Sequence, residues 1–294
     1  LHYGISVHES VSVVKNKDSG KMQGFRVHDH LKSFKDSSHH LDMPTFDEKE
    51  LLGCIQELVK LDKDWINCLG EPDQLYARMT HFSMDKRLGV STPQQTKMLV
   101  FLNPIQYSQK PLAVKCSYNV NRNWPLGHGT YRLSGNLGPL IPSVQDAKMN
   151  GFDDVLWLLD DYIKELTVLN FFVLQQSRYG NIELVTPPSD DGIMNGTMRK
   201  TILELKDKIQ ENFKCKVVDR EISIHEVINS SKEGRLIEMF GAATHCPLQP
   251  VNRVVYRDSS MILDNIGKGS ISAGINNLLQ DTMKGTNKWI TPFE

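Results

Sequence analysis

The chain has 294 residues, 39% of them apolar and 23% charged, which is an ordinary globular composition. A chain of this length is long for a single small core, so we expect two domains. Its 34 basic and 35 acidic residues give a net charge of -1 without a block of like charge, which argues against a nucleic-acid partner or an electrostatic membrane surface. No apolar run approaches the length of a membrane span. Five scattered cysteines without metal-type spacing indicate a reducing compartment, so we expect a cytoplasmic location, with a mitochondrial one as the alternative.

The first clear element is a helix predicted over residues 45–65. Asp47 can accept hydrogen bonds from the amides of the first turn while Glu50 reaches back, and Phe46 can pack on Leu51 as a hydrophobic staple. Apolar residues then recur at helical spacing: Leu51, Leu52, Ile55, Leu58 and Val59. We expect this stripe to pack on a sheet.

A strand is predicted at 98–104, where a continuous apolar run ends at Pro104 and is expected to be covered on both faces. The polar stretch after it has no periodicity and is interpreted as a linker between domains. The expected organisation is therefore a small α/β domain at 1–104, a linker at 105–112 and a large domain at 113–294.

The large domain is expected to mix strands with helices. The strand predictions are 153–159, 170–176 and 182–188, with Arg178 to Asn181 as a hairpin connection. Helical spacing runs from Met198 to Phe213 and from Ile271 to Met283. Together these elements predict a curved sheet combined with helices.

Several stretches resemble the branched-chain amino-acid aminotransferases, fold-type IV enzymes that use pyridoxal phosphate. The matching stretches are LHYGISVHES, LGVSTP, YRLSGNLGP, GFDDVLWL, KELTVLN, IELVTPP, EGRLIEMFGAATHCPLQP and WITPF. They follow the family order along the whole chain. The resemblance implies an α/β (α+β) fold with a small α/β domain and a larger mixed β/α domain, the cofactor between them, and a homodimer. It also implies that the first part of the small domain precedes this sequence.

The resemblance places Arg132 where the family has a lysine. In the family, that lysine bonds to the cofactor aldehyde and then carries a proton between two carbons of the reacting group. Both tasks need an amine that can lose its proton, whereas a guanidinium stays protonated and offers only donors. We therefore expect Arg132 to be inactive in the lysine's role.

Other positions also depart from the family pattern. Its phosphate-binding arginine matches Ser33, a change expected to cost about 1.5–3 kcal/mol of phosphate binding. Its tyrosine at the cofactor's ring oxygen matches Leu137, which has no polar atom. Two pocket positions match His8 and His245, whose size and polarity do not suit a branched aliphatic substrate.

A third set keeps groups that the family uses. Glu165 matches the carboxylate that faces the pyridine nitrogen, Thr244 a threonine at the phosphate, and Thr197 and Met198 the amides that receive the phosphate at a helix start. The remaining matches are Tyr3, Tyr76 and Arg78 near the substrate, and Cys246 with Gln249 in place of a CxxC redox pair. Pyridoxal phosphate is therefore the implied cofactor, although Ser33 and Leu137 weaken the case for its binding here.

Four histidines, His28, His30, His39 and His40, raise the question of a metal. They lack acid or cysteine partners at ligand spacing, so no metal site is predicted, and we expect them on an exposed helix.

These observations favour a pseudoenzyme of the branched-chain aminotransferase type, with a binding, scaffolding or regulatory role as a homodimer or as a heterodimer with an active relative. Two alternatives stay open. One is a working pyridoxal-phosphate enzyme that transfers amino groups between leucine, isoleucine or valine and 2-oxoglutarate. The other is a structural or storage protein recruited from such an enzyme.

Overall fold

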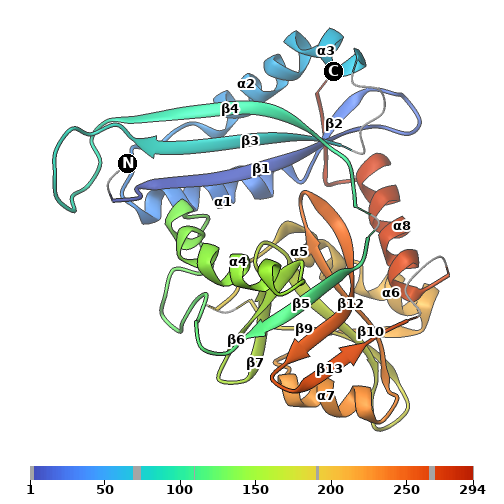
Figure 1. Cartoon of the computed structure of the whole chain (residues 1–294). Helices are drawn as coiled ribbons and strands as arrows, with labels where there is room; N and C mark the ends of the chain where they lie inside the picture. Colours follow the sequence, from blue (N-terminus) through green and yellow to red (C-terminus); the bar gives the residue numbers. More distant parts are fainter. Residues whose placement is uncertain (1–2, 69–73, 109, 190–191, 265–268, 294) are drawn as a thin grey trace. The chain divides into compact units, whose positions relative to one another are not determined.

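The structure is a computed structural model that describes residues 3–68, 74–108, 110–189, 192–264 and 269–293. It divides into two compact units (Figure 1). Unit 1 comprises Leu1–Tyr107, Tyr131–Gly138 and Gln280–Glu294, and unit 2 comprises Ser108–Thr130 and Pro139–Leu279. This division differs from the predicted domain boundaries, because two segments of the predicted large domain, 131–138 and 280–294, belong to unit 1.

Unit 1 contains a five-stranded antiparallel sheet in the order β14-β2-β1-β3-β4. The strands are β1 Ser6–Lys15, β2 Met22–Phe25, β3 Gln74–Ser83, β4 Thr96–Ile105 and β14 Ile290–Pro292. Alternation along β1 places Val7, Val11 and Val13 in the core of the unit, fully buried.

Three helices complete unit 1: α1 Val27–His40, α2 Glu48–Leu61 and α3 Lys63–Cys68. Helix α1 contacts β1, and α2 contacts α1 and β4 (Figure 1). The predicted start of α2 is confirmed, because the Asp47 carboxylate accepts from the amides of Lys49 and Glu50 at 2.7 and 3.2 Å. Leu51, Ile55 and Val59 form its buried face.

The predicted strand at 98–104 is confirmed as part of β4, but the expectation that both faces are covered is wrong. β4 is an edge strand, and its residues alternate between half-buried and exposed. Met98 and Val100 pack on the core, whereas Leu99 and Phe101 are 51% and 44% exposed. The continuous apolar run therefore belongs to a strand that has only one covered face.

Residues 131–134 lie along an edge of β1 that no strand of the sheet occupies. β2 pairs with β1 only from Ser12 to Lys15, and beyond that point Leu133 forms a bridge with Val7. The His8 amide donates to the Arg132 carbonyl at 3.0 Å. The short turn η1 Ser134–Asn136 follows. This pairing explains why the segment belongs to unit 1.

Unit 2 contains a nine-stranded mixed sheet in the order β10-β9-β8-β11-β12-β5-β6-β7, with β13 paired to β12. β7 also pairs with β8, so the sheet closes on itself. The strands are β5 Leu112–Ser117, β6 Asp154–Leu159, β7 Tyr162–Leu166, β8 Asn170–Gln176, β9 Ile182–Thr186, β10 Cys215–Asp219, β11 Leu236–Ala243, β12 Cys246–Tyr256 and β13 Ser259–Ile262. The three predicted strands correspond to β6, β8 and β9.

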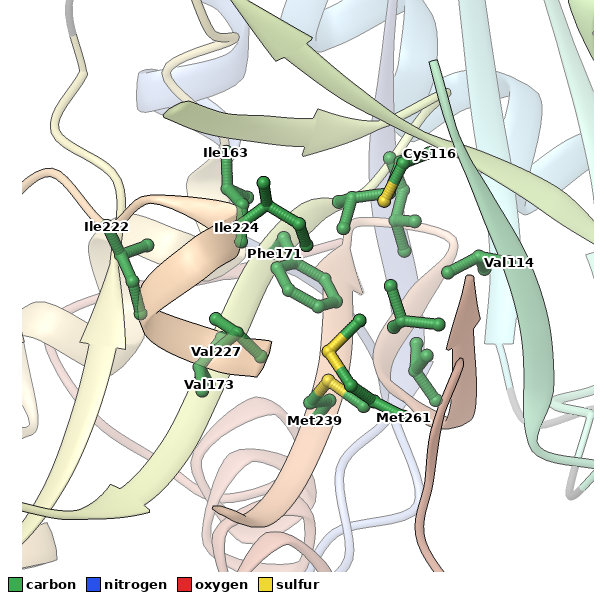
Figure 2. Packing of buried hydrophobic residues seen from close by; sticks show 14 of the residues in the cluster. Val114, Cys116, Ile163, Phe171, Val173, Ile222, Ile224, Val227, Met239 and Met261 are labelled. Atoms are coloured by element: carbon green, nitrogen blue, oxygen red, sulfur yellow. The ribbon is translucent and has the colours of Figure 1, made fainter. Parts of the chain in front are cut away.

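The core of unit 2 lies between this sheet and α7. Figure 2 shows Ile224 and Val227 of α7 packed near Phe171 of β8, with Met239 and Met261 beside them. The helices are η2 Gly138–Leu140, α4 Ile141–Met149, α5 Thr197–Glu204, α6 Lys206–Phe213, α7 Ile224–Lys232 and α8 Ile271–Lys284, with η2 and α8 continuing across the division between the units.

Two predictions about helices have different outcomes. The helix predicted from Ile271 to Met283 is confirmed as α8. The helix predicted from Met198 to Phe213 is wrong as a single element, because the backbone leaves helical geometry at Leu205, with φ -90° and ψ 8°. Among the described residues, no helix combines the length and the apolar character needed to cross a membrane.

Candidate functional site

The predicted site residues fall into two groups, one in each unit. Unit 1 holds Tyr3, His8, Ser33, Tyr76, Arg78, Arg132 and Leu137. Unit 2 holds Glu165, Thr197, Met198, Thr244, His245, Cys246 and Gln249. The roles that the resemblance assigns to these residues remain predictions.

Arg132 in unit 1 is fixed by its backbone. Its amide donates to the Ser37 hydroxyl at 3.0 Å, and its carbonyl accepts from the His8 amide. The preceding Tyr131 stacks on His40 with 3.7 Å between the ring centroids. The Arg132 side chain, 19% exposed, turns toward Glu9 and places its Nε 3.0 Å from Glu9 Oε2.

Glu9 is the buried anion of this group. Its side chain is 3% exposed, and its Oε1 accepts from the Ser10 amide at 2.7 Å and lies 3.3 Å from His30 Nδ1. Burial alone would raise the pKa of this carboxyl, but the charges of Arg132 and His30 and the hydrogen bonds from His30 and Ser10 together lower the pKa of Glu9 to about 2. Glu9 therefore carries a negative charge at neutral pH.

His30 corrects one sequence expectation. It was expected on the exposed face of a helix, yet it is fully buried on α1 and faces Glu9. The spacing explains this placement, since His30 lies three residues after Val27 and four before Phe34, both of which are buried. His28, His39 and His40 are exposed, as expected.

His8 is uncharged at neutral pH. Burial and the nearby guanidinium groups of Arg78 and Arg132 lower the pKa of His8 to about 4, although Glu9 opposes the shift. Its Nδ1 shares a hydrogen bond with the Ser134 hydroxyl at 3.1 Å.

The other predicted residues of unit 1 lie on separate elements. Ser33 is half-buried on α1, and its carbonyl accepts from the Ser37 hydroxyl at 2.8 Å. Leu137 is half-buried and closes the η1 turn with its amide. Arg78 Nη1 donates to the Ser10 hydroxyl at 3.2 Å, across the paired strands β3 and β1. The last two are Tyr76, half-buried on β3, and Tyr3, whose hydroxyl accepts from the Gly89 amide at 2.8 Å.

Glu165 is the centre of the group in unit 2. It lies on β7 and is 1% exposed. Its carboxylate forms an ion pair with Arg122, and it accepts from the Met194 amide at 3.0 Å and from the Asn170 amide side chain at 3.3 Å. Arg122 is also buried. Its Nη1 faces Glu165 in the ion pair, and its Nε donates no hydrogen bond within the described part of the chain.

The start of α5 adjoins this cluster. Gly196 caps the helix without a side chain, and a Cβ at this position would lie 2.0 Å from Asn170 Oδ1, so only glycine fits the present arrangement. Thr197 and Met198 form the buried first turn. A helix start with a nearby arginine favours an anion, because the first amides and the helix dipole both present positive charge.

The remaining residues of unit 2 lie at the β11–β12 turn. Thr244 is 7% exposed, and His245 is half-buried. Cys246 contacts the Gln249 side chain at 3.6 Å and the Leu248 carbonyl at 3.4 Å.

Sequence reasoning missed Glu9, Arg122 and Asn170. A signal existed for Glu9, since it occupies an inward position of a strand that otherwise alternates valine inward. Arg122 and Asn170 gave no such signal, because only the tertiary fold brings them to Glu165.

A family model for "Amino-transferase class IV" matches residues 7–254. The chain belongs to this family. It is 32% identical to the mitochondrial branched-chain-amino-acid aminotransferase of Bos taurus over 277 residues, which is 92% of the chain and 69% of the relative. It is 31% identical to a probable branched-chain-amino-acid aminotransferase of Staphylococcus aureus over 294 residues, which is 97% of the chain and 79% of the relative.

Solved structures support the same fold. The branched-chain aminotransferase of Escherichia coli matches with a TM-score of 0.81 at 19% identity, covering 100% of this chain and 91% of that one. The enzyme of Thermobaculum terrenum in its PLP-form matches with a TM-score of 0.80 at 20% identity, covering 100% and 92%. These likenesses confirm the predicted α/β fold of fold-type IV.

The comparisons correct the functional prediction. The sequence favoured a pseudoenzyme because of a few positions, chiefly Arg132, Ser33 and Leu137. The bovine and staphylococcal relatives match over almost the whole chain, and both are named as aminotransferases. The findings therefore support the alternative of a working branched-chain aminotransferase, and the pseudoenzyme interpretation is wrong.

Proposed function

We propose that the protein is a branched-chain amino-acid aminotransferase that uses pyridoxal phosphate and transfers amino groups between leucine, isoleucine or valine and 2-oxoglutarate. The observation that carries this proposal is the identity of 30% or more, over most of the chain, to curated relatives that bear this name. The fold shared with solved branched-chain aminotransferases agrees with it.

The residues of unit 2 fit the cofactor. Arg122 Nε, which donates no hydrogen bond among the described residues, and the start of α5, which has no side-chain cap, are donors suited to a phosphate. Glu165 is a buried carboxylate suited to a protonated pyridine nitrogen. Pyridoxal phosphate, when bound, supplies an electron sink for the carbon that loses its proton. The residues of the chain then have to bind it, orient it and hold the charges around it.

Arg132 fits neither task of the family's lysine, because a guanidinium at ordinary pH neither bonds to an aldehyde nor gives up its proton, so another base has to carry the proton in this proposal. We therefore propose that the cofactor is held here by noncovalent contacts. Such a cofactor should leave the protein on dialysis and should have to be supplied in excess during assays.

The test is formation of glutamate from leucine and 2-oxoglutarate, measured with excess pyridoxal phosphate. We expect leucine-dependent glutamate from the native chain and a large loss of rate in Glu165→Ala. Glu57→Ala, which breaks the exposed ion pair with Lys60, is the matched control and should keep the rate. Absence of leucine-dependent glutamate at saturating cofactor would refute the proposal.

Two further expectations remain proposals. We propose a cytoplasmic location and a dimer, either of two copies or with a related chain. The relatives' names include both mitochondrial and cytosolic enzymes, so they favour neither compartment. Fractionation of cells and the mass of the protein in solution would test these proposals.

A further inference from the structure

The side chain of Arg132 has donors that the rest of unit 1 does not satisfy. Its Nε lies 3.0 Å from Glu9 Oε2, but neither atom makes a hydrogen bond to another described residue. The hydrogen bonds of Arg132 to described residues involve only its backbone, so its two Nη groups donate to none of them. The guanidinium is therefore held by the charge of Glu9, and its two Nη groups remain available to bind a ligand through two parallel hydrogen bonds.

The position of this guanidinium is fixed. The Arg132 backbone is anchored on one side by Ser37 of α1 and on the other by His8 of β1. Glu9 then attracts the side chain from within the core of the unit. Little conformational freedom is left to lose when a ligand binds, which favours affinity.

The surroundings suit an anion rather than a cation. Glu9 is the acid that faces this guanidinium, and it is already engaged with His30 and the Ser10 amide as well as with Arg132. Arg78 supplies a second guanidinium on the adjacent strand, bonded to Ser10. His8 lies near both guanidinium groups. A planar carboxylate is the small anion that pairs best with the two free Nη groups of an arginine.

We propose that Arg132 binds the carboxylate of the amino-acid or keto-acid substrate, with Glu9 as the residue that positions its guanidinium. This inference rests on the proposed function, which makes carboxylic acids the substrates. It gives Arg132 a role in binding the substrate, because a guanidinium cannot take the role of the family's lysine, which bonds to the cofactor aldehyde.

The experiment measures binding to the cofactor-free protein, so it does not depend on turnover. The probes are 4-methylpentanoate, which carries the carboxylate, and 4-methylpentanamide, its neutral isostere, titrated separately and followed by NMR. We expect the acid to bind at least about tenfold more tightly than the amide. We expect its Kd to rise about tenfold in Arg132→Lys, which keeps the charge but loses the fork, and about 100-fold in Arg132→Gln.

Matched changes at Arg178, an exposed arginine of the β8–β9 hairpin, should leave the Kd within about twofold. Because Arg132→Gln removes a countercharge from buried Glu9, its fold is checked by circular dichroism, and Arg132→Lys gives the answer if the glutamine variant unfolds. The inference is overturned if neither Arg132 variant binds the acid more weakly, if the amide binds as tightly as the acid, or if the acid does not bind.

The two proposals fail separately. Acid binding that depends on Arg132, together with no leucine-dependent glutamate, would refute the aminotransferase and retain the carboxylate site. Glutamate formation with acid binding that is indifferent to Arg132 would do the reverse.

Discussion

Glu9 and Arg132 form a pair in which opposite charges lie 3.0 Å apart without a hydrogen bond between the facing atoms. A buried carboxylate gains most of its stability from such a neighbour, and losing the neighbour leaves an uncompensated charge. The pair joins β1 to a segment that lies far along the chain, so its charge state should affect the stability of unit 1.

The first prediction concerns acid. The pKa of Glu9 falls from 4.5 to about 2 on folding, so its contribution to stability is fully present above pH 4.5 and is lost as the pH falls toward 2. We expect the free energy of unfolding to drop across this range by no more than ~3 kcal/mol from this group. Urea unfolding at several pH values measures it. Glu9→Gln should flatten the curve in this range, and an unchanged slope would contradict the assignment.

The second prediction concerns His8, whose protonation affects stability at a higher pH than that of Glu9. Its pKa is lowered from 6.5 to about 4 in the folded chain, so the unfolded chain takes up a proton that the folded chain refuses. The stability that this group provides is present above pH 6.5 and is lost as the pH falls to 4. NMR titration of the His8 ring should give a midpoint near 4. A midpoint near 6.5 would show that the ring is solvated.

The third prediction concerns the chemistry of position 132. Arg132→Lys introduces an amine that can bond to the cofactor aldehyde. After addition of pyridoxal phosphate and reduction with borohydride, mass spectrometry should find an adduct on residue 132 in the variant and none on the native Arg132. An adduct on another lysine of the native chain would show a different attachment point and would refute noncovalent binding.

The fourth prediction concerns the start of α5. Gly196→Ala would place a Cβ 2.0 Å from Asn170 Oδ1. The Nδ2 of the same asparagine donates a hydrogen bond to the Glu165 carboxylate. We expect a loss of about 1–3 kcal/mol in unfolding free energy and weaker cofactor binding. Gly53→Ala on α2 is the matched control, because a Cβ there meets no atom within 4 Å. It should stabilise the protein by ~0.5–1 kcal/mol. Equal effects of the two changes would contradict this prediction.

The fifth prediction concerns the cap of α2. Asp47→Ala removes the acceptor for the amides of Lys49 and Glu50 and should cost about 1 kcal/mol of unfolding free energy. Asp36→Ala, which breaks only the exposed ion pair with Lys32, should cost less than about 0.5 kcal/mol. Thermal melts of the two variants give the comparison.

Local patterns predicted the fold well where one signal governed the backbone. The Asp47 cap, the strand at 170–176 and the stripe of α8 are set by neighbours in sequence, so the sequence could show them. The break at Leu205 escaped because the apolar spacing continues through it. The exposed face of β4 was not predicted, because edge and central strands can carry the same residue types.

The site was harder to predict than the fold. A family pattern indicates which positions carry chemistry, and it pointed to Arg132 and Glu165. It could not show that Glu9 accompanies Arg132, or that Arg122 accompanies Glu165, because these pairs form only when distant segments meet. The functional error had a related cause, since single positions were given more weight than the chain as a whole.

The sheet of unit 1 takes its outermost strand, β14, from residues 290–292, and the edge of β1 is filled by residues 131–134. During synthesis, a nascent chain that has released only β1 to β4 from the ribosome still lacks both segments. Its unpaired strand edges stay open to wrong partners while unit 2 is translated, and long-range pairing of this kind is slow. Chaperones should therefore bind unit 1 while its sheet still lacks β14 and residues 131–134, even though β1 is synthesised first.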